Sequence, residues 1–320
     1  MDNISRRGLL TGAGAVLAAG ALGVPTASAR SLDLPASKRF KMSATTNEFF
    51  RSKPLWGPTV MQSFAFDTPN NRLFTGQLRS GTGEFSGDLT LSQLDFAGNV
   101  LGHMYLTGFG HAVSIGAEAV GSTSYIWTET DADTTNGRGR SITRFPWQNG
   151  KTLTSAAVTK WKPVSGGSVY TPAVDQRFGQ VGIRHARPGG MYINVYSLAA
   201  ARTGNFSTVL ASFKQPALTS DIDFQGWALY GSYAYFWEGE AYPGAPDETK
   251  ANSKLWCYDI NAGTLVDSFL TLAGKSLTYR EAEGMAVYGS TDGTARLYFG
   301  FASGVSGDRR ANLFYRNTLV

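Results

Sequence analysis

Cysteine and histidine are scarce in this chain of 320 residues, which contains one cysteine and three histidines. A single thiol excludes a disulfide scaffold and a multi-cysteine metal site, and three histidines leave few ligands for a histidine-rich metal cage. Charged residues make up only 17% of the chain. Beyond the first thirty residues there is no long stretch of strong helix formers, so a helical bundle is excluded.

Glycine and aromatic residues are abundant instead, with 38 glycines, 19 phenylalanines, 14 tyrosines and 7 tryptophans. The hydrophobic fraction of 42% is sufficient for one large core, which excludes a disordered chain. The formal net charge of +5 suits an anionic partner without identifying one. We expect no nucleic-acid partner.

The first 29 residues have the pattern of a cleavable export signal. Arg6 and Arg7 precede an uncharged run over residues 11–24, and small residues at Ala27 and Ala29 precede the expected cleavage site. The paired arginines predict the twin-arginine route and therefore a secreted protein. A membrane anchor is the less favoured alternative, because the run is shorter than the ~20 apolar residues needed to span a bilayer. After cleavage we expect no stable membrane insertion.

Short apolar or alternating runs, separated by glycine, proline and Asn-Gly or Asp-Gly pairs, follow one another from about residue 40 onward. This pattern is typical of many closely spaced strands. Five similar units begin near Gln62, His111, Thr171, Gln225 and Glu283, a period of roughly 50 to 60 residues. The period predicts an all-β, five-bladed β-propeller with four strands in each unit. A two-sheet sandwich, the main alternative, would not require it.

The last unit ends after its third strand, which leaves one outer strand missing. The alternating run Lys38–Ser43 precedes the first unit, and we predict that it supplies this strand and closes the ring. The chain is therefore divided into a twin-arginine signal (1–29), an N-terminal segment with the ring-closing strand (30–54) and the β-propeller (55–320).

Polar and aromatic residues are concentrated in the loops that lead into each unit and in those between its second and third strands. Antiparallel pairing places both kinds of loop on one face of the ring. The residues that we predict to bind a ligand there are Trp56, Gln62, Tyr170, Arg184, His185, Gln225, Tyr242, Arg280 and Arg309. Aromatic faces stack on sugar rings and arginines bind carboxylate or phosphate. The predicted partner is an anionic cell-wall or extracellular polysaccharide.

An alternative hypothesis makes the same face the active site of a polysaccharide lyase or glycoside hydrolase. His111 would be the base of a β-elimination, or Glu238 and Glu283 would supply the acid and base of a hydrolysis. Each also has a structural interpretation, in which His111 fixes the start of its blade and the acids balance nearby arginines. A protein-interaction platform is the third hypothesis.

Two further expectations concern protonation and cofactors. Arg184 and Arg187 flank His185 and are expected to keep its imidazole neutral. The sequence lacks the dinucleotide, phosphate-loop, zinc-protease and serine-hydrolase motifs, and we predict no cofactor. Asp131 and Asp133 are candidate Ca²⁺ ligands, but two acids are an incomplete ligand set.

Several runs resemble one known family: residues 61–66 (MQSFAF), 87–95 (GDLTLSQLD), 108–118 (GFGHAVSIGAE), 125–129 (YIWTE) and 144–147 (RFPW). Over residues 55–318 the chain is similar to the propeller shared by teichoic acid biosynthesis protein C of Gram-positive bacteria and the receptor-binding proteins of certain staphylococcal phages. The resemblance implies a five-bladed propeller that recognises cell-wall glycopolymers such as wall teichoic acid. Members tend to have a glycine after the histidine, where this chain has Ala112.

Overall fold

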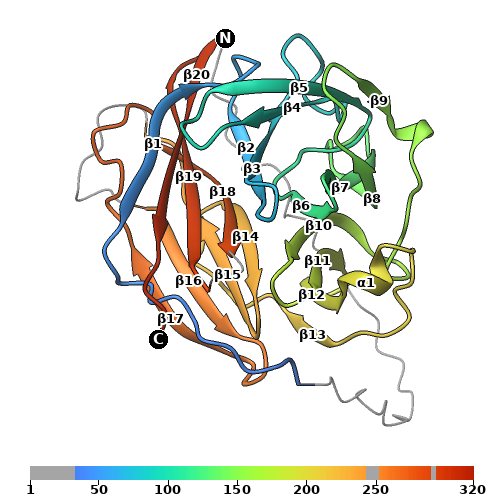
Figure 1. The fold of residues 1–320 in the computed structure, drawn as a ribbon, viewed down its shortest axis with the longest axis vertical. Coiled ribbons are helices and arrows are strands. Elements are labelled where there is room, and N and C mark those ends of the chain that lie inside the picture. The colour runs from blue at the N-terminus through green and yellow to red at the C-terminus, as the bar shows by residue number, and fades with distance from the viewer. Residues whose placement is uncertain (1–32, 243–251, 290–292) are drawn as a thin grey trace, which may run out of the picture.

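Five sheets surround one central axis (Figure 1). This computed structural model describes residues 33–242, 252–289 and 293–320, and the predicted signal, residues 1–29, lies outside the described residues. Within each sheet, successive strands follow one another outward from the axis, so each sheet is one blade. We number the blades one to five along the chain. The prediction of an all-β five-bladed propeller is confirmed.

The strands are given from the axis outward. Those of blade one are β2 (Met61–Asp67), β3 (Arg72–Leu78), β4 (Leu89–Leu94), β5 (Val100–Thr107) and β9 (Thr152–Thr154). Those of blade two are β6 (Gly116–Val120), β7 (Thr123–Ala132) and β8 (Gly139–Pro146). Those of blade three are β10 (Ser168–Asp175), β11 (Gln180–Arg187), β12 (Gly190–Ser197) and β13 (Ala211–Lys214).

Blades four and five complete the ring. The strands of blade four are β14 (Phe224–Tyr230), β15 (Tyr233–Glu238), β16 (Lys254–Asp259) and β17 (Thr264–Leu270). Those of blade five are β18 (Glu281–Gly289), β19 (Ala295–Val305), β20 (Asp308–Arg316) and β1 (Asn47–Pro54). The helical segments of the described chain are a 3-10 turn (Ser155–Ala157) and α1 (Leu198–Ala201).

Alanine occupies the inner strand of every blade where the five sheets meet. These residues line an axial cavity of about 20 Å³ and are Ala65, Ala117, Ala173, Ala228 and Ala286. A cavity of this size has room for about one water molecule. The axis is therefore packed like a core, and a ligand must bind at one end of it or on the outside of the ring.

One apolar cluster lies between each pair of neighbouring blades. Between blades one and two, Phe74 packs with Ile126 and Phe145. Between blades four and five, Trp237 packs on Phe299, with ring centroids 5.1 Å apart. Because apolar burial is the main stabilising contribution, every blade depends on both of its neighbours and the ring has to close.

The ring is closed by β1, which pairs antiparallel with β20. The prediction that Lys38–Ser43 forms this strand is wrong. That run instead crosses the chain end, where the main chain of Arg39 exchanges hydrogen bonds with Val320, and its Phe40 is buried between blades four and five. The true strand was hidden because bulges interrupt its alternation, and Ser52 has a φ of 54°.

Blade two has three strands and not the four expected for every unit. After β8 the chain crosses to the rim of blade one, where β9 runs parallel to β5. It returns at Trp161, whose main chain makes two hydrogen bonds of 2.9 Å with Ile142 of β8. The Trp161 indole packs on Trp127, with ring centroids 5.9 Å apart. One bridge and one aromatic contact therefore cover the edge of β8 in place of a strand.

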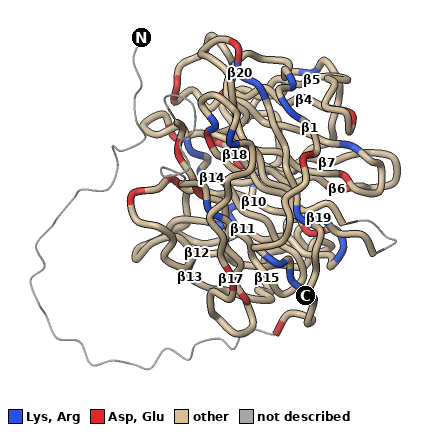
Figure 2. Tube along the Cα trace, turned by 90° about the vertical axis from the view of Figure 1, so that its left-hand side faces the viewer, with Lys and Arg blue, Asp and Glu red and all other residues tan. Residues whose placement is uncertain are grey.

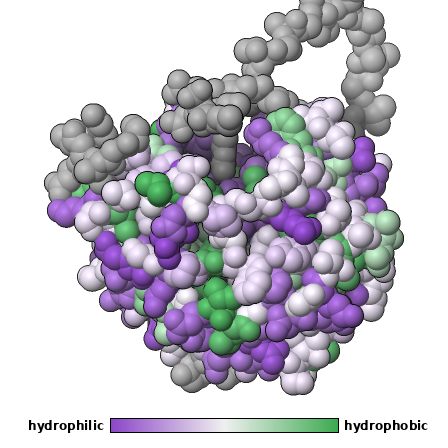
Figure 3. Space-filling view, turned by 90° about the horizontal axis from the view of Figure 1, so that it is seen from above, coloured by the Kyte–Doolittle hydropathy of each residue, from purple (hydrophilic) through white to green (hydrophobic). Residues whose placement is uncertain are grey.

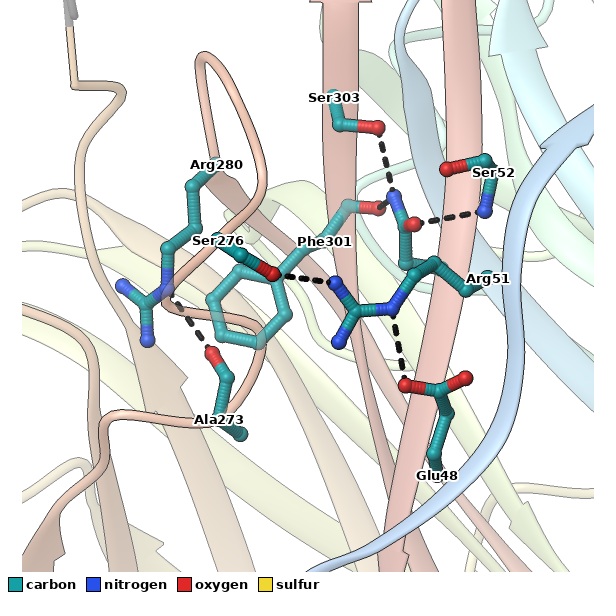
Figure 4. A network of polar contacts seen from close by, with 9 residues as sticks. Glu48, Arg51, Ser52, Ala273, Ser276, Arg280, Phe301 and Ser303 are labelled. Atoms are coloured by element: carbon teal, nitrogen blue, oxygen red, sulfur yellow. Dashed lines mark hydrogen bonds and ion pairs between the residues drawn. The ribbon is translucent and has the colours of Figure 1, made fainter. Parts of the chain in front are cut away.

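Ring closure can be tested at Asn312, a fully buried residue of β20. Its Oδ1 accepts the Ser52 N–H (2.8 Å), while its Nδ2 donates to the Phe301 carbonyl (3.0 Å) and to Ser303 Oγ (2.9 Å); the partners Ser52, Phe301 and Ser303 are labelled in Figure 4. Asn312→Ala leaves buried polar groups unsatisfied and should lower the free energy of unfolding by about 1–3 kcal/mol. Urea denaturation measures this, with the exposed Asn317→Ala as control. Equal stability of the two variants would contradict the assignment.

Candidate functional site

The inner strands of the first three blades begin beside one another at the same end of the axis. Ser63 Oγ of β2 donates to the carbonyl of Ala112, just before β6, at 2.5 Å. Ser114 Oγ, also just before β6, donates to the carbonyl of Pro172 in β10 at 2.9 Å. These side-chain bonds connect neighbouring blades close to the axis.

The remaining blades complete the circle through close backbone contacts. Trp227 Nε1 of β14 donates to the Thr171 carbonyl of β10 at 3.3 Å. A Cβ added to Gly226 would lie 3.0 Å from the main chain of β18, and one added to Gly284 would lie 2.7 Å from the Ser63 Cα. We call this end of the ring the mouth. It consists of the starts of the inner strands and of residues 57–60, 108–115, 158–167, 215–223 and 271–280 in the lead-in loops.

Four of the predicted site residues lie around the mouth. Each is the sequence neighbour of a residue that contacts another blade near the axis, namely Ser63, Ala112, Gly226 or Gly284. The four are Gln62, His111, Gln225 and Glu283. Gln62 is 3% exposed, Gln225 and Glu283 are each 1% exposed, and His111 is half-buried. Gln225 Nε2 donates to the Gly239 carbonyl at 3.0 Å. The structure therefore brings these four residues to one end of the axis, mostly below its surface.

Each blade also has one buried side chain at a common position in its second strand. In each blade the axial alanine of the inner strand pairs with a residue of the second strand, and the buried side chain lies three residues after that residue. We call these residues the loop anchors, and they are Gln77, Glu129, His185, Glu238 and Phe301. Gln77 Nε2 donates to the carbonyls of Gly57 (2.9 Å) and Thr59 (2.6 Å) in the lead-in loop of blade one. Gln77, Glu129 and Glu238 hydrogen-bond the chain where it enters their blades.

Glu129 is the anchor of blade two. Its Oε1 accepts the N–H groups of His111 (2.9 Å) and Ala112 (2.8 Å), and its Oε2 accepts the N–H of Gly139. A Cβ at position 139 would lie 2.4 Å from this side chain, so glycine is required there. Burial raises the pKa of the Glu129 carboxyl, while the nearby charge of Arg138 and the three N–H groups oppose that change.

Arg184 lies next to this carboxylate. Its Nε donates to Gln215 Oε1 at 2.6 Å, and its guanidinium lies 3.9 Å from the centre of the Phe224 ring. The pKa of Arg184 is lowered to about 9, mainly by burial and also by repulsion from Arg138, while the charge of Glu129 opposes both. The charges of Arg138 and Glu129 therefore both act on Arg184, in opposite directions. Sequence analysis left Arg138 and Glu129 out of the site, and their only signal was their place near the β7–β8 hairpin on this face.

The opposite side of the mouth, on blade five, is acidic. The guanidinium of Arg309 lies 3.3 Å from the centre of the Tyr279 ring. Burial raises the pKa of the Tyr279 hydroxyl, the charges of Glu281 and Glu283 raise it further, and Arg309 opposes them. A ligand spanning the mouth would therefore meet an excess of arginine on one side and of carboxylate on the other.

Three predicted residues are engaged by the protein itself. The carboxylate of Glu238 is fully buried and accepts the N–H (3.0 Å) and the hydroxyl of Thr219. Arg280 donates to the Ala273 and Thr271 carbonyls and to Ser253 Oγ, each at 2.9 Å, and Figure 4 shows its side chain beside Ala273 and Phe301. Burial lowers the pKa of Arg280 to about 10. Tyr242 is 7% exposed and its hydroxyl accepts the Asn252 N–H.

His185 is fully buried between the rings of Tyr170 and Tyr192, and its Nδ1 lies 3.2 Å from the Ile183 carbonyl. Burial lowers the pKa of His185, and the charges of the flanking arginines add to this more weakly. The sequence predicted the direction correctly but named only the smaller cause.

Two aromatic residues differ from what was expected. Trp56 does not lie at the mouth, because its ring stacks on His103 of β5, the fourth strand of blade one. Tyr170 is fully buried and its hydroxyl donates to the Val164 carbonyl at 2.8 Å. The loop order assigned both residues to the correct connections but could not give the direction of their side chains.

The acids considered for Ca²⁺ are used in local contacts. Asp131 forms ion pairs with Arg140 (3.7 Å) and Lys160 (3.5 Å), and Asp133 accepts two hydrogen bonds from Thr135. Within residues 33–242, 252–289 and 293–320, no group of three or more His, Cys, Asp or Glu side chains is placed to hold a metal ion. A search of the same residues finds no helix with the length and apolarity needed to cross a bilayer.

The outer surface carries charges of both signs. Basic and acidic residues are interspersed along the chain in Figure 2, and hydrophilic or neutral residues cover most of the face in Figure 3, where hydrophobic residues form small groups. An anionic ligand would therefore be selected by a local arrangement of arginines and not by a broad basic surface.

These features define a five-bladed β-propeller around a packed axis, with a set of buried polar side chains at the mouth. More particularly, the chain belongs to the family described as the phage five-bladed β-propeller receptor-binding platform domain, whose profile matches residues 60–315.

Two known proteins are similar to this chain. The chain is 25% identical over 294 residues to the "Putative major teichoic acid biosynthesis protein C" of Bacillus subtilis (strain 168); the match covers 86% of this chain and 63% of the relative. The tail fiber of Staphylococcus aureus phage P68 has a similar structure, with a TM-score of 0.71 at 18% identity, over 85% of this chain and 52% of that one. The chain thus spans less than two thirds of either relative.

The buried His185 predicts a pH dependence of stability. Below pH 6.5, its ordinary pKa, the unfolded chain binds a proton that the folded protein excludes, so the free energy of unfolding falls as the pH falls. This contribution has a slope of at most about 1.4 kcal/mol per pH unit. In urea denaturation from about pH 7 to about pH 5, His185→Gln should lose stability less steeply than the wild type. Parallel pH profiles would contradict the assignment.

Proposed function

We propose that this protein is secreted and binds an anionic cell-wall or extracellular glycopolymer at the mouth. The observation that carries the proposal is that Arg138 and Arg184 lie near the buried Glu129 carboxylate, which binds the N–H of Gly139, the residue after Arg138, and whose charge acts together with that of Arg138 on Arg184. Two guanidinium groups and one carboxylate leave an excess of one positive charge. A phosphate or carboxylate of the polymer would neutralise this excess and accept hydrogen bonds in the planar geometry that arginine favours.

The family supports this class of ligand. It is described as a receptor-binding platform, one relative is a tail fiber of a staphylococcal phage, and the other is named for teichoic acid biosynthesis. Teichoic acids are cell-wall polymers that carry a phosphate in each repeating unit. We therefore propose a teichoic-acid-like or uronate-containing polymer as the ligand.

The acidic side of the mouth would contact the uncharged part of a repeating unit. Glu281, which is partly exposed, supplies carboxylate oxygens that accept hydrogen bonds from hydroxyl groups, whereas Gln62, Gln225 and Glu283 lie below the surface of the mouth. The ligand that fits both sides has an anionic group and several hydroxyls within one repeating unit. This description matches a phosphate-linked or uronate-containing glycan.

Cleavage of the polymer is the less favoured alternative. Hydrolysis by Glu238 and Glu283 would require both carboxyl groups to reach the substrate. The Glu238 carboxylate is fully buried and holds Thr219, and Glu283 is 1% exposed. We therefore propose binding, and incubation with teichoate, uronate and arabinan polymers should release no reducing ends or unsaturated uronate.

Substitution of Arg138 tests the proposed site. Arg138→Ala should weaken binding to purified Gram-positive cell walls by about tenfold or more, because charge-assisted hydrogen bonds to the anionic group are lost. Arg140→Ala is the matched control, because Arg140 lies near the same hairpin, is 52% exposed and pairs with Asp131. Sedimentation of labelled protein with the walls gives the two affinities.

The comparison also identifies the ligand class. Walls stripped of anionic polymer should not bind the wild type, and added salt should weaken binding to intact walls. The proposal fails if Arg138→Ala and Arg140→Ala bind equally well, or if stripped walls bind as well as intact ones.

Secretion is tested at the paired arginines. Residues 1–29 fused to a reporter that is exported only when folded should deliver it across the membrane of a host with twin-arginine transport. Arg6→Lys combined with Arg7→Lys keeps the charge and should abolish export. Continued export of the double variant would exclude the twin-arginine route.

A further inference from the structure

An exposed aromatic group lies on the outer part of blade one, away from the mouth. The indole of Trp56 stacks on the imidazole of His103, with ring centroids 3.7 Å apart and an angle of 6° between the rings. One face of the indole is covered in this way, yet 50% of the residue is exposed. Trp56 therefore offers solvent a flat aromatic surface supported from behind.

Two polar side chains border this surface. Trp56 Nε1 donates to the Tyr105 hydroxyl at 2.9 Å, and the guanidinium of Arg79 lies 4.2 Å from the centre of the Tyr105 ring. Within the described chain Arg79 has no ion pair, and it is half-exposed. We call Trp56, His103, Tyr105 and Arg79 the aromatic platform.

The backbone that carries Trp56 is held in place before any ligand arrives. The Trp56 N–H donates to Ser92 Oγ at 3.2 Å. The next residues of the loop are fixed by the anchor Gln77, which binds the carbonyls of Gly57 and Thr59, and by Thr59 Oγ1, which donates to the Leu78 carbonyl at 2.6 Å. A preorganised surface loses little conformational entropy on binding.

The platform is separate from the mouth. His103 and Tyr105 belong to β5, which lies at the rim of the ring in Figure 1. They share a sheet face with Leu94, which packs against blade five. The arginine pair of the mouth belongs to blades two and three, so the two sites differ in both blade and distance from the axis.

We propose that the aromatic platform is a second binding site, for a pyranose ring that carries a phosphate or carboxylate. The C–H face of the sugar would stack on the exposed face of Trp56, as sugars do on rigid aromatic surfaces. The anionic group would bind Arg79, the unpaired cation beside it. This inference does not require the mouth to bind anything.

The charge of Arg79 decides between the ligands that an aromatic surface can take. A quaternary ammonium ligand is attracted by aromatic faces, but Arg79 would repel it. An uncharged sugar would use only the stacking contact, whereas a sugar phosphate would use both. The expected order of affinity is therefore sugar phosphate, then neutral sugar, with no binding of choline.

The test uses the whole protein with glucose 1-phosphate, methyl glucoside and choline chloride as probes, followed by saturation-transfer NMR and by tryptophan fluorescence. Trp56→Ala should weaken binding of both sugars by about tenfold or more, whereas Trp56→Phe, which retains a ring, should keep most of it. Arg79→Gln should remove the preference for the phosphate and leave methyl glucoside unaffected. Leu101→Ala is the control, because it removes another exposed apolar side chain (58%) from β5, the strand that carries His103 and Tyr105.

The proposal is overturned if Trp56→Ala binds the sugars as the wild type does, if Leu101→Ala weakens binding as much as Trp56→Ala, or if choline binds. Folding of each variant is checked by its urea midpoint. Sedimentation with cell walls separates the two proposals, because loss of binding in Arg138→Ala but not in Trp56→Ala supports the mouth alone. The reverse result supports the platform alone.

Discussion

The hydrogen bonds that the loop anchors Gln77, Glu129 and Glu238 make to the chain leading into their blades are the constraint on which the mouth depends. The anchors occupy one register position of the second strand and are fully buried, where an unpaired polar group would be costly. Polar anchors such as Gln77 and Glu129 meet this demand by binding main-chain groups of the incoming loop. In blade five the anchor is the apolar Phe301. The guanidinium of Arg280 lies 4.3 Å from the centre of its ring, and Arg280 binds the main-chain carbonyls of the incoming loop.

This constraint explains why several residues that suggested catalysis are structural. Glu238 is chemically suited to proton transfer, yet its oxygens hold Thr219, and Arg280 is occupied by three acceptors in its own neighbourhood. A ligand can be met only by groups left partly exposed once the anchors are in place. In the described chain these include Arg138 and Arg309 at the mouth and Trp56 on the rim.

The sequence predicted the fold better than the site, for a physical reason. The sequence repeat predicts the blades, because each blade must bury both of its faces against its neighbours and therefore has the same pattern of apolar residues. The five sequence units correspond to the five blades. The repeat failed for β1, where bulges break the alternation, and for blade two, where an aromatic contact covers the edge in place of a strand. The order of the loops predicted the face of the ring on which the main chain of Glu238 and Trp56 lies. It could not distinguish a side chain that anchors a loop from one that is free to bind a ligand, because both roles use the same types of residue. The direction of a side chain depends on packing that no local pattern encodes.

One rigid loop connects the two proposed binding sites. Residues 55–60 carry Trp56 at one end, and the carbonyl of Pro58 accepts the N–H of Arg309 at the mouth at 3.1 Å. Gln77 fixes the segment between them, so the two surfaces keep a constant separation. A polymer repeats its charged unit along its length, and once one unit is bound the next is presented at a high effective concentration. Two weak sites on one rigid ring would then favour a polymer over its free monomer without either site binding the monomer tightly.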